Sequence, residues 1–158
     1  MVVESLSQSC WSDHYLLKLD GRPWGEYRSR WFSEGMDVNL TGRRQLRLEK
    51  SGWMGSRFQL IDTSSAQRLA EAEQTGIFGV GWELRLGGRA ARLVRPGWFS
   101  SDLAAMQGDR VVAKIHRVGW CQSGWSISDD GSLQDTDLLF IGLIYHTILR
   151  REAAAAST

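Results

Sequence analysis

The sequence predicts a mainly β protein: a closed antiparallel barrel of about twelve strands around a central hydrophobic C-terminal α-helix. Three observations predict this fold class. The chain of 158 residues contains 8 tryptophans and 17 glycines, a composition that favours pleated strands joined by tight turns. Turn signals recur along the middle of the chain, and one segment near the C-terminus is apolar on every side.

The turn signals divide the chain into short segments that suit antiparallel strands. From residue 41 onward most of them lie about 9 to 12 residues apart, as in a meander of hairpins. They are Asp20-Gly21, Thr41-Gly42, Ser51-Gly52, Ser64-Ser65, Thr75-Gly76, Gly87-Gly88, Pro96-Gly97, Gly108-Asp109 and Asp130-Gly131. Between the turns apolar residues recur at every second position, so that one face of each strand points to a common interior. These positions are Tyr15, Leu17, Leu19, Leu46, Leu48, Phe58, Leu60, Trp82, Leu84, Leu86, Val111, Ala113, Ile115, Trp125 and Ile127.

The hairpin at Gly87-Gly88 predicts its own register. If the two glycines form a two-residue loop, counting outward from them brings apolar residues together and opposite charges together. The pairs are Leu86 with Arg89, Leu84 with Ala91, Glu83 with Arg92, and Trp82 with Leu93. Residues 66 to 74 contain good helix formers and could form two helical turns, but their place between two turn signals favours a strand.

Residues 138 to 149 predict a helix buried inside the protein. Asp135, Thr136 and Asp137 offer capping side chains and acidic charge at its start. Arg150 and Arg151 supply positive charge at its end, and we expect the helix to cover about residues 136 to 151. Its large side chains leave no polar face, and about 12 apolar residues are fewer than the roughly 18 to 20 that cross a bilayer. We therefore expect no transmembrane segment.

A closed sheet is the arrangement that surrounds such a helix on all sides. A barrel of eight strands is filled by its own side chains, whereas a larger barrel has room for a helix and leaves no open edge. The ten to twelve strands that the turn signals define fit the larger barrel.

The domain organisation follows from these elements. We expect a flexible N-terminus over residues 1–12, a single barrel domain over 13–151 and a disordered alanine-rich tail over 152–158. The chain starts without the basic and apolar regions of a secretory signal. Cys10 and Cys121 form neither a disulfide framework nor a zinc-binding spacing. These features predict a cytoplasmic protein, with the membrane periphery as an alternative.

Composition and motifs lower the odds of several function classes. The formal net charge of +1, with 19 basic and 18 acidic residues, argues against a nucleic-acid partner. The sequence lacks the G-x-S-x-G, H-E-x-x-H, C-x-x-C and Walker motifs, so we expect no enzymatic activity, no metal and no cofactor. His146 should lie in the core as a hydrogen-bonded imidazole, and His116 should point outward into solvent.

Two groups of residues leave alternatives open. Trp53, Trp82, Trp98, Trp120 and Trp125 each follow a glycine, and their rings either line a ligand cavity or membrane-facing rim, or fill the space between barrel wall and helix. We favour the second interpretation. The arginines at 43, 44, 47, 85, 89, 92 and 95 form either a phosphate-binding face or ordinary solvated strand faces, and interspersed acids favour the latter.

The order of these features resembles the tubby C-terminal-like barrels, which include the LURP-one-related proteins and the phospholipid scramblases. The resemblance covers residues 14 to 151. It is carried by "LDG" at 19–21, "FQLIDTSS" at 58–65, and "WSISDDG" at 125–131, which leads into "DLLFIGLIYHTILRR" at 137–151. It implies a twelve-stranded barrel around a central helix.

The resemblance also implies a function. It predicts a non-enzymatic module that binds a phosphoinositide, another anionic lipid headgroup or a protein partner. The nearest match to the family's Lys-x-Arg strand motif is Lys114 to Arg117, which differs in residue type and spacing. Together with Arg85 and Arg92, Lys114 and Arg117 are the residues that we expect to bind lipid phosphate. The alternatives are a lipocalin-like carrier with a hollow interior and an enzyme without a recognisable motif.

Overall fold

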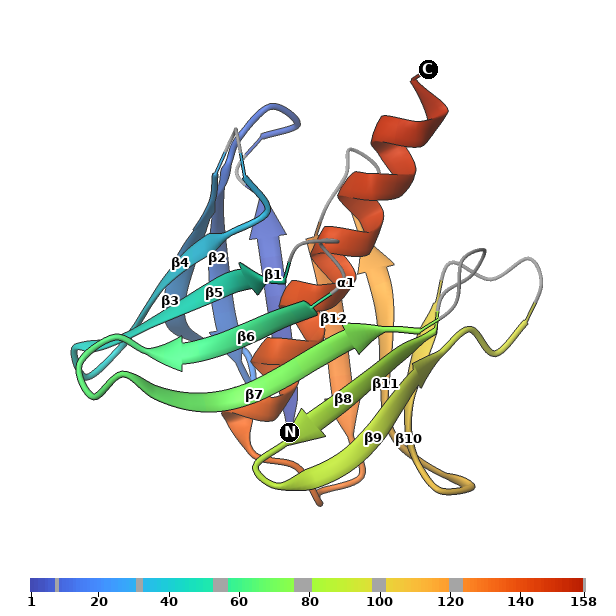
Figure 1. Cartoon of the computed structure of the whole chain (residues 1–158). Coiled ribbons are helices and arrows are strands. Elements are labelled where there is room, and N and C mark those ends of the chain that lie inside the picture. Colours follow the sequence, from blue (N-terminus) through green and yellow to red (C-terminus); the bar gives the residue numbers. More distant parts are fainter. Residues whose placement is uncertain are drawn as a thin grey trace.

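The fold is a closed antiparallel barrel of twelve strands with one C-terminal helix, as expected (Figure 1). The computed structural model describes residues 1–7, 9–30, 33–52, 57–75, 81–97, 102–119 and 124–157. The strands are β1 (Val2–Ser7), β2 (His14–Leu19), β3 (Arg22–Ser29), β4 (Met36–Leu40), β5 (Arg44–Ser51), β6 (Arg57–Asp62), β7 (Gln67–Gln74), β8 (Trp82–Leu86), β9 (Arg89–Val94), β10 (Leu103–Gln107), β11 (Arg110–Val118) and β12 (Gly124–Asp129). The helix α1 covers Asp135–Ala156.

Each strand pairs with the next one along the chain, and β12 pairs with β1 to close the barrel. The predicted register at Gly87-Gly88 is confirmed, with Leu84 opposite Ala91 and Glu83 opposite Arg92. Both glycines have positive φ angles, 57° and 88°, as a tight hairpin turn requires. Residues 66 to 74 supply β7, which confirms the preference for a strand over a helix there.

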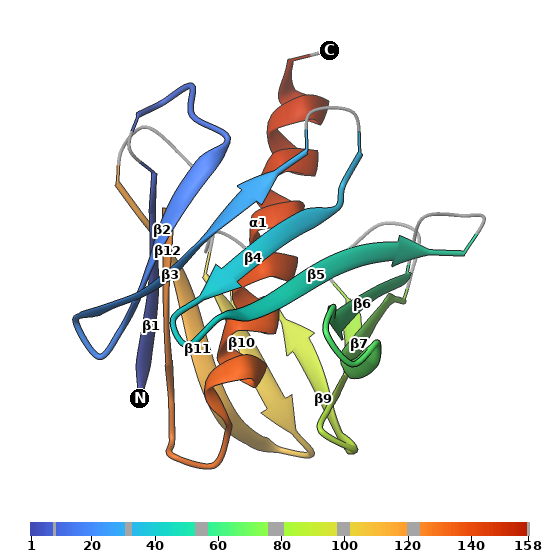
Figure 2. The ribbon, with the colours of Figure 1, turned by 90° about the vertical axis from the view of Figure 1, so that its left-hand side faces the viewer.

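The barrel has two rims, and the links between strands alternate between them because consecutive strands run in opposite directions. The helix α1 starts at the rim where β12 ends and passes through the barrel (Figures 1 and 2). We call this end the helix-start rim and the end where α1 leaves the barrel the helix-end rim. The links from β1 to β2, β3 to β4, β5 to β6, β7 to β8, β9 to β10 and β11 to β12 join strand ends at the helix-end rim.

The helix fills the barrel. Its large apolar side chains from Leu138 to Ile144 are fully buried, and they form one core cluster with the inward-facing side chains of the strands. Burial of a Leu, Ile or Phe side chain stabilises a fold by roughly 1.5 to 3 kcal/mol, so the helix is a main part of the core. No helix among the described residues is long and apolar enough to span a membrane.

A polar network lies inside this core around the hydroxyl of Tyr27. Trp125 Nε1–H donates to that oxygen at 3.1 Å, Ser5 Oγ lies 2.9 Å away and His146 Nδ1 lies 3.1 Å away. Burial raises the pKa of Tyr27 above its ordinary value, against the lowering effect of its hydrogen bonds, so the hydroxyl is neutral at neutral pH. The expected hydrogen-bonded core position of His146 is confirmed.

The expected domain ends need correction. The N-terminus expected to be flexible contains β1, whose Val3 and Ser5 are fully buried between β12 and β2. The alanine-rich tail expected to be disordered continues α1 to Ala156, because alanine has the highest helix propensity and Arg95 pairs with Glu152 at 2.8 Å.

One cysteine also differs from expectation. Cys10, between β1 and β2, is disulfide-bonded. The other cysteine in the sequence, Cys121, lies outside the described residues.

Candidate functional site

Two of the residues expected to bind lipid phosphate, Arg85 and Arg92, lie on the outer face of β8 and β9. They line a shallow pocket of about 430 Å³ together with Glu71, Glu73 and Glu83. Arg85 lies opposite Glu71, and Arg92 lies opposite Glu83. Since the pocket holds more carboxylates than guanidinium groups, it is a poor site for an added anion.

The other two expected residues, Lys114 and Arg117, lie on opposite faces of β11. Side chains alternate along a strand, and no register shift separates the two positions. Lys114 is exposed on the outer face, whereas Arg117 is exposed at the helix-end rim, on the side of its register partner Trp125, which is fully buried. The four expected residues therefore do not converge on one patch.

A larger pocket, of about 610 Å³, lies at the helix-end rim, and we call it the helix-end pocket. Three segments that are far apart in the sequence form it: the link from β3 to β4, the end of β5 and the last part of α1. Its lining residues are Arg30, Ser33, Glu34, Gly35, Leu48, Glu49, Lys50 and Arg150. Across the first link, the backbone N–H of Arg30 donates to the carbonyl of Gly35 at 3.2 Å and joins the two ends of the link.

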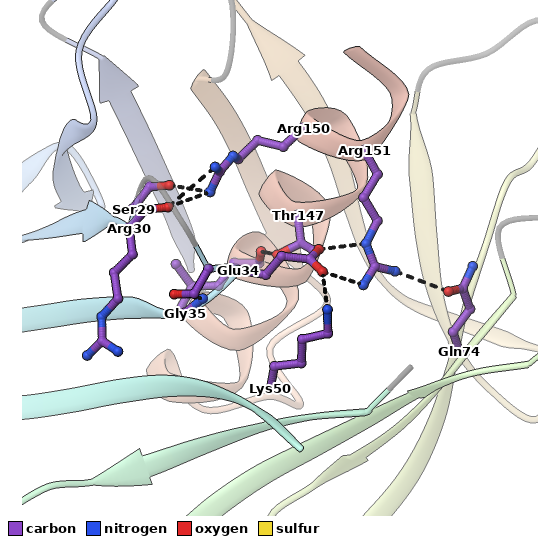
Figure 3. Close-up of polar contacts among 11 residues, drawn as sticks. Ser29, Arg30, Glu34, Gly35, Lys50, Gln74, Thr147, Arg150 and Arg151 are labelled. Atoms are coloured by element: carbon purple, nitrogen blue, oxygen red, sulfur yellow. Dashed lines mark hydrogen bonds and ion pairs between the residues drawn. The ribbon is translucent and has the colours of Figure 1, made fainter. Parts of the chain in front are cut away.

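Glu34 is the centre of the charged contacts at this pocket (Figure 3). Lys50 Nζ donates to Glu34 Oε1 at 2.7 Å. Arg151 donates to both carboxylate oxygens, from Nε at 2.6 Å and from Nη2 at 3.0 Å. Burial acts to raise the pKa of Glu34, but the hydrogen bonds from Arg151 and Lys50 outweigh it and hold that pKa below its ordinary value.

Arg151 also packs on the core below it. Its guanidinium carbon lies 5.5 Å from the ring centre of Phe58 and 5.7 Å from that of Trp82, which is the range of cation–π contacts. Its Nη1 donates to Gln74 Oε1 at 3.1 Å (Figure 3). Arg151 therefore connects the helix with β6, β7 and β8 and serves as a structural part of the rim.

Arg150 differs from Arg151 in its partners (Figure 3). It donates to Ser29 Oγ and to the carbonyl of Arg30, which are both neutral acceptors. Among the described residues no carboxylate lies within ion-pair distance of Arg150. Its guanidinium is thus held in place while its charge is not neutralised. We call Glu34, Lys50, Arg150 and Arg151 the helix-end cluster.

A second pocket, of about 210 Å³, borders the first. Arg30 and Arg150 line both pockets, so the two are neighbours. The second pocket is also lined by Cys10, Trp11, Ser12, Asp13, Tyr15 and Ser29. The pair of pockets offers guanidinium donors, an ammonium group and hydroxyls beside an aromatic ring, together with the carboxylates of Glu34, Glu49 and Asp13. Arg150 contacts only neutral acceptors, so it is the donor that suits an anion best.

No sequence pattern singled out Glu34 or Lys50, and Arg150 and Arg151 were expected only to supply charge at the helix end. A doubly basic end of an apolar helix was the one available signal for this site. The arginines that we considered as a phosphate-binding face are mostly solvated or paired with acids. This agrees with the favoured interpretation, which was ordinary solvated strand faces. Arg44, Arg47 and Arg95 each form an ion pair with a carboxylate.

The glycine-preceded tryptophans divide into two sets. Trp82 and Trp125 are buried in the core, as the favoured interpretation predicts. Trp53, Trp98 and Trp120 lie outside the described residues. In the described ranges no group of three or more His, Cys, Asp or Glu residues is placed to hold a metal ion.

Comparisons of the chain with protein-family models, with curated proteins and with solved structures gave no match.

Proposed function

We propose that the chain is a non-enzymatic, tubby-like module that binds the phosphate of an anionic membrane-lipid headgroup in the helix-end pocket. The observation that supports this proposal best is the state of Arg150, a half-buried guanidinium that neutral acceptors hold in place at the border of two pockets. An arginine offers five N–H donors, and a phosphate is the ligand that accepts several of them at once.

The charges around Arg150 support the same class of ligand. Lys50 and Arg30 also line the larger pocket; Lys50 lies on β5 and Arg30 directly follows β3, and the fold brings both to the same rim. Glu34 and Glu49 lie in the same lining, so cations outnumber acids only slightly. We therefore infer moderate, salt-sensitive binding of a headgroup and not strong attraction of any polyanion.

The competing carrier hypothesis needs a hollow barrel. The residues of α1 from Thr136 to Ile148 are buried among the strands, which leaves no space there for a carried molecule. If the chain binds none of the vesicles in the test below, a protein partner that presents an anionic group is the alternative.

Vesicle sedimentation tests the proposal. The full chain is mixed with vesicles of phosphatidylcholine alone, or with added phosphatidylserine or a phosphoinositide, at low and high salt. Binding is expected to the anionic vesicles only and to weaken with salt. Lys50→Gln should weaken it about fivefold, since a basic residue near an anionic surface contributes about 1 kcal/mol.

Lys114→Gln is the matched control, because Lys114 is an exposed lysine on the outer face of β11. This variant should bind like the wild type. Arg150→Lys keeps the charge but loses the fork of donors, so it should retain the salt dependence with lower affinity. Equal losses for Lys50→Gln and Lys114→Gln would mean diffuse charge attraction and would overturn the proposed site.

A further inference from the structure

The β1–β2 hairpin carries an exposed apolar group. Leu6 and Leu16 are 39% and 38% exposed, and they are direct cross-strand partners. Their strand neighbours Ser5 and Leu17 are buried, so the two leucines point away from the barrel interior. Trp11, in the link between the strands, is 90% exposed. Of the large apolar side chains exposed in the described ranges, most belong to this hairpin.

This apolar group lies beside the cationic pockets. Trp11 lines the smaller pocket together with Arg30 and Arg150, the two arginines that also line the larger one. The link that holds Trp11 is at the helix-end rim. An exposed indole next to guanidinium groups suits the interface between lipid headgroups and acyl chains. Amphipathic rings and basic side chains are both stabilised there.

The sequences of the other links that join strands at this rim also contain aromatic residues. Each of the links from β3 to β4, β5 to β6, β7 to β8, β9 to β10 and β11 to β12 contains a tryptophan or a phenylalanine. Those side chains lie outside the described residues. The turns at the helix-start rim, such as Asp20-Gly21 and Gly87-Gly88, contain no aromatic residue.

We infer that the β1–β2 hairpin docks the helix-end rim onto the interface of an anionic bilayer, with Trp11, Leu6 and Leu16 entering the headgroup region. This inference rests on the proposed function and extends it, since docking in this orientation would turn both pockets toward the lipid headgroups. It assigns the hairpin an apolar contribution to binding that salt does not screen.

The test separates the apolar contribution from headgroup recognition. Leu16→Ser and Trp11→Ala are compared with Val111→Ser, a control of matched exposure (39%) on β11 beside the helix-start rim. Val111 was expected to face the interior, but a register shift between β10 and β11 brings Val112 there instead. We expect Leu16→Ser to weaken binding to mixed phosphatidylcholine–phosphatidylserine vesicles about threefold to tenfold, and Trp11→Ala at least as much. Val111→Ser should leave binding unchanged. Calorimetric binding of the soluble headgroup, glycerophosphoserine, should be the same for Leu16→Ser and the wild type.

Each failure has a different signature. Wild-type vesicle binding in the Leu16→Ser and Trp11→Ala variants, with soluble headgroup binding intact, overturns the docking surface and leaves the proposed function standing. Vesicle binding that responds to Leu16→Ser but not to Lys50→Gln or Arg150→Lys overturns the proposed headgroup site instead. If light scattering shows that the wild type is a dimer and that Trp11→Ala is a monomer, the hairpin packs against a second copy of the chain. The docking inference is then wrong.

Discussion

The indole of Trp125 lies against the bare Cα of Gly142, in the space that a side chain on the helix would need. A Cβ built on Gly142 would stand 2.1 Å from Cη2 of Trp125 and 2.4 Å from Cζ2, far closer than carbon atoms approach. Gly142 is therefore the position that lets the helix pass next to β12, and Trp125 is the side chain that fills the gap.

Gly142→Ala should destabilise the protein. The added methyl group must displace a buried ring that is also hydrogen-bonded to Tyr27, and overpacking of this kind costs about 1 to 3 kcal/mol. The better helix propensity of alanine offsets roughly 1 kcal/mol of that. Urea unfolding should give a net loss of up to about 2 kcal/mol in the free energy of unfolding.

A second background checks the cause of that loss. In Trp125→Leu the space opposite Gly142 is open, so Gly142→Ala should there be neutral or stabilising. Gly97→Ala is the control in the wild-type background, since a Cβ at Gly97 meets nothing within 4 Å. Additive losses in the double variant would show that the contact between the helix and the Trp125 ring is not the cause of the destabilisation by Gly142→Ala.

Tyr27→Phe should also lower stability. It leaves Trp125 Nε1–H, Ser5 and His146 without the oxygen at the centre of their network, and a buried polar group without its partner costs about 1 to 3 kcal/mol. Ser5→Ala should cost less, because the Tyr27 hydroxyl keeps two partners. Chemical unfolding of both variants measures the order, and a larger loss in Ser5→Ala would contradict it.

Ile144→Asp should abolish soluble folding. Ile144 is fully buried on a helix that has no polar face, so the carboxylate would be ionised inside the core or would have to be neutralised at high cost. Ala154→Asp, at an exposed position of the same helix, should stay soluble with nearly the same melting temperature. The soluble fraction after expression and the melting temperature test both, and a stable Ile144→Asp variant would show that the helix is not central.

Glu34 should contribute to the pH dependence of stability. Its pKa is lowered in the folded state, because the hydrogen bonds from Arg151 and Lys50 outweigh the effect of burial. The carboxylate therefore stabilises the fold above its unfolded pKa, and this contribution is lost as the pH falls through the lower folded pKa.

Glu34→Gln measures this contribution. The variant should be less stable than the wild type by about 1 kcal/mol near neutral pH, and the difference should disappear in acid. Glu73→Gln is the comparison, since its more exposed pair with Arg57 should contribute less. A difference that stays constant from neutral to acidic pH would exclude the carboxylate charge as its source.

Glu34→Gln should lower stability but strengthen the binding of anionic vesicles. Without its charge, Glu34 no longer neutralises Lys50 and Arg151, and the helix-end pocket becomes more positive. Glu34→Gln should therefore bind anionic vesicles about fivefold more tightly than the wild type in the sedimentation assay. Weaker binding would mean that Glu34 is needed to hold the cations in position.

The sequence predicted the parts of the fold that local patterns determine. Alternation and turn residues located most strands, and the register at Gly87-Gly88 followed from the turn alone. The uniform apolar character of 138–149 predicted a buried helix. The first strand was missed because its role depends on β12, whose Ser128 pairs with Val2 from the other end of the chain.

The candidate site could not be predicted from the sequence, because its residues also come together only through long-range contacts. Glu34 and Lys50 are 16 residues apart, and Glu34 and Arg151 are 117 apart, so only the closed barrel brings them together. Strand order also decides which basic residues share a patch. The expected set of Arg85, Arg92, Lys114 and Arg117 was chosen by residue type. Residue type does not specify the acidic neighbours that lie beside Arg85 and Arg92 in the barrel.

Pairing between β1 and β12 has a consequence for biosynthesis. The ring of strands cannot close until β12 has left the ribosome, and α1 follows later still, so the interior stays without its filling until α1 has been translated. Such long-range pairing slows folding and leaves an open, apolar sheet in the meantime. The nascent chain should therefore depend on chaperones, and a stop codon placed just before α1 should yield a product that aggregates or is degraded.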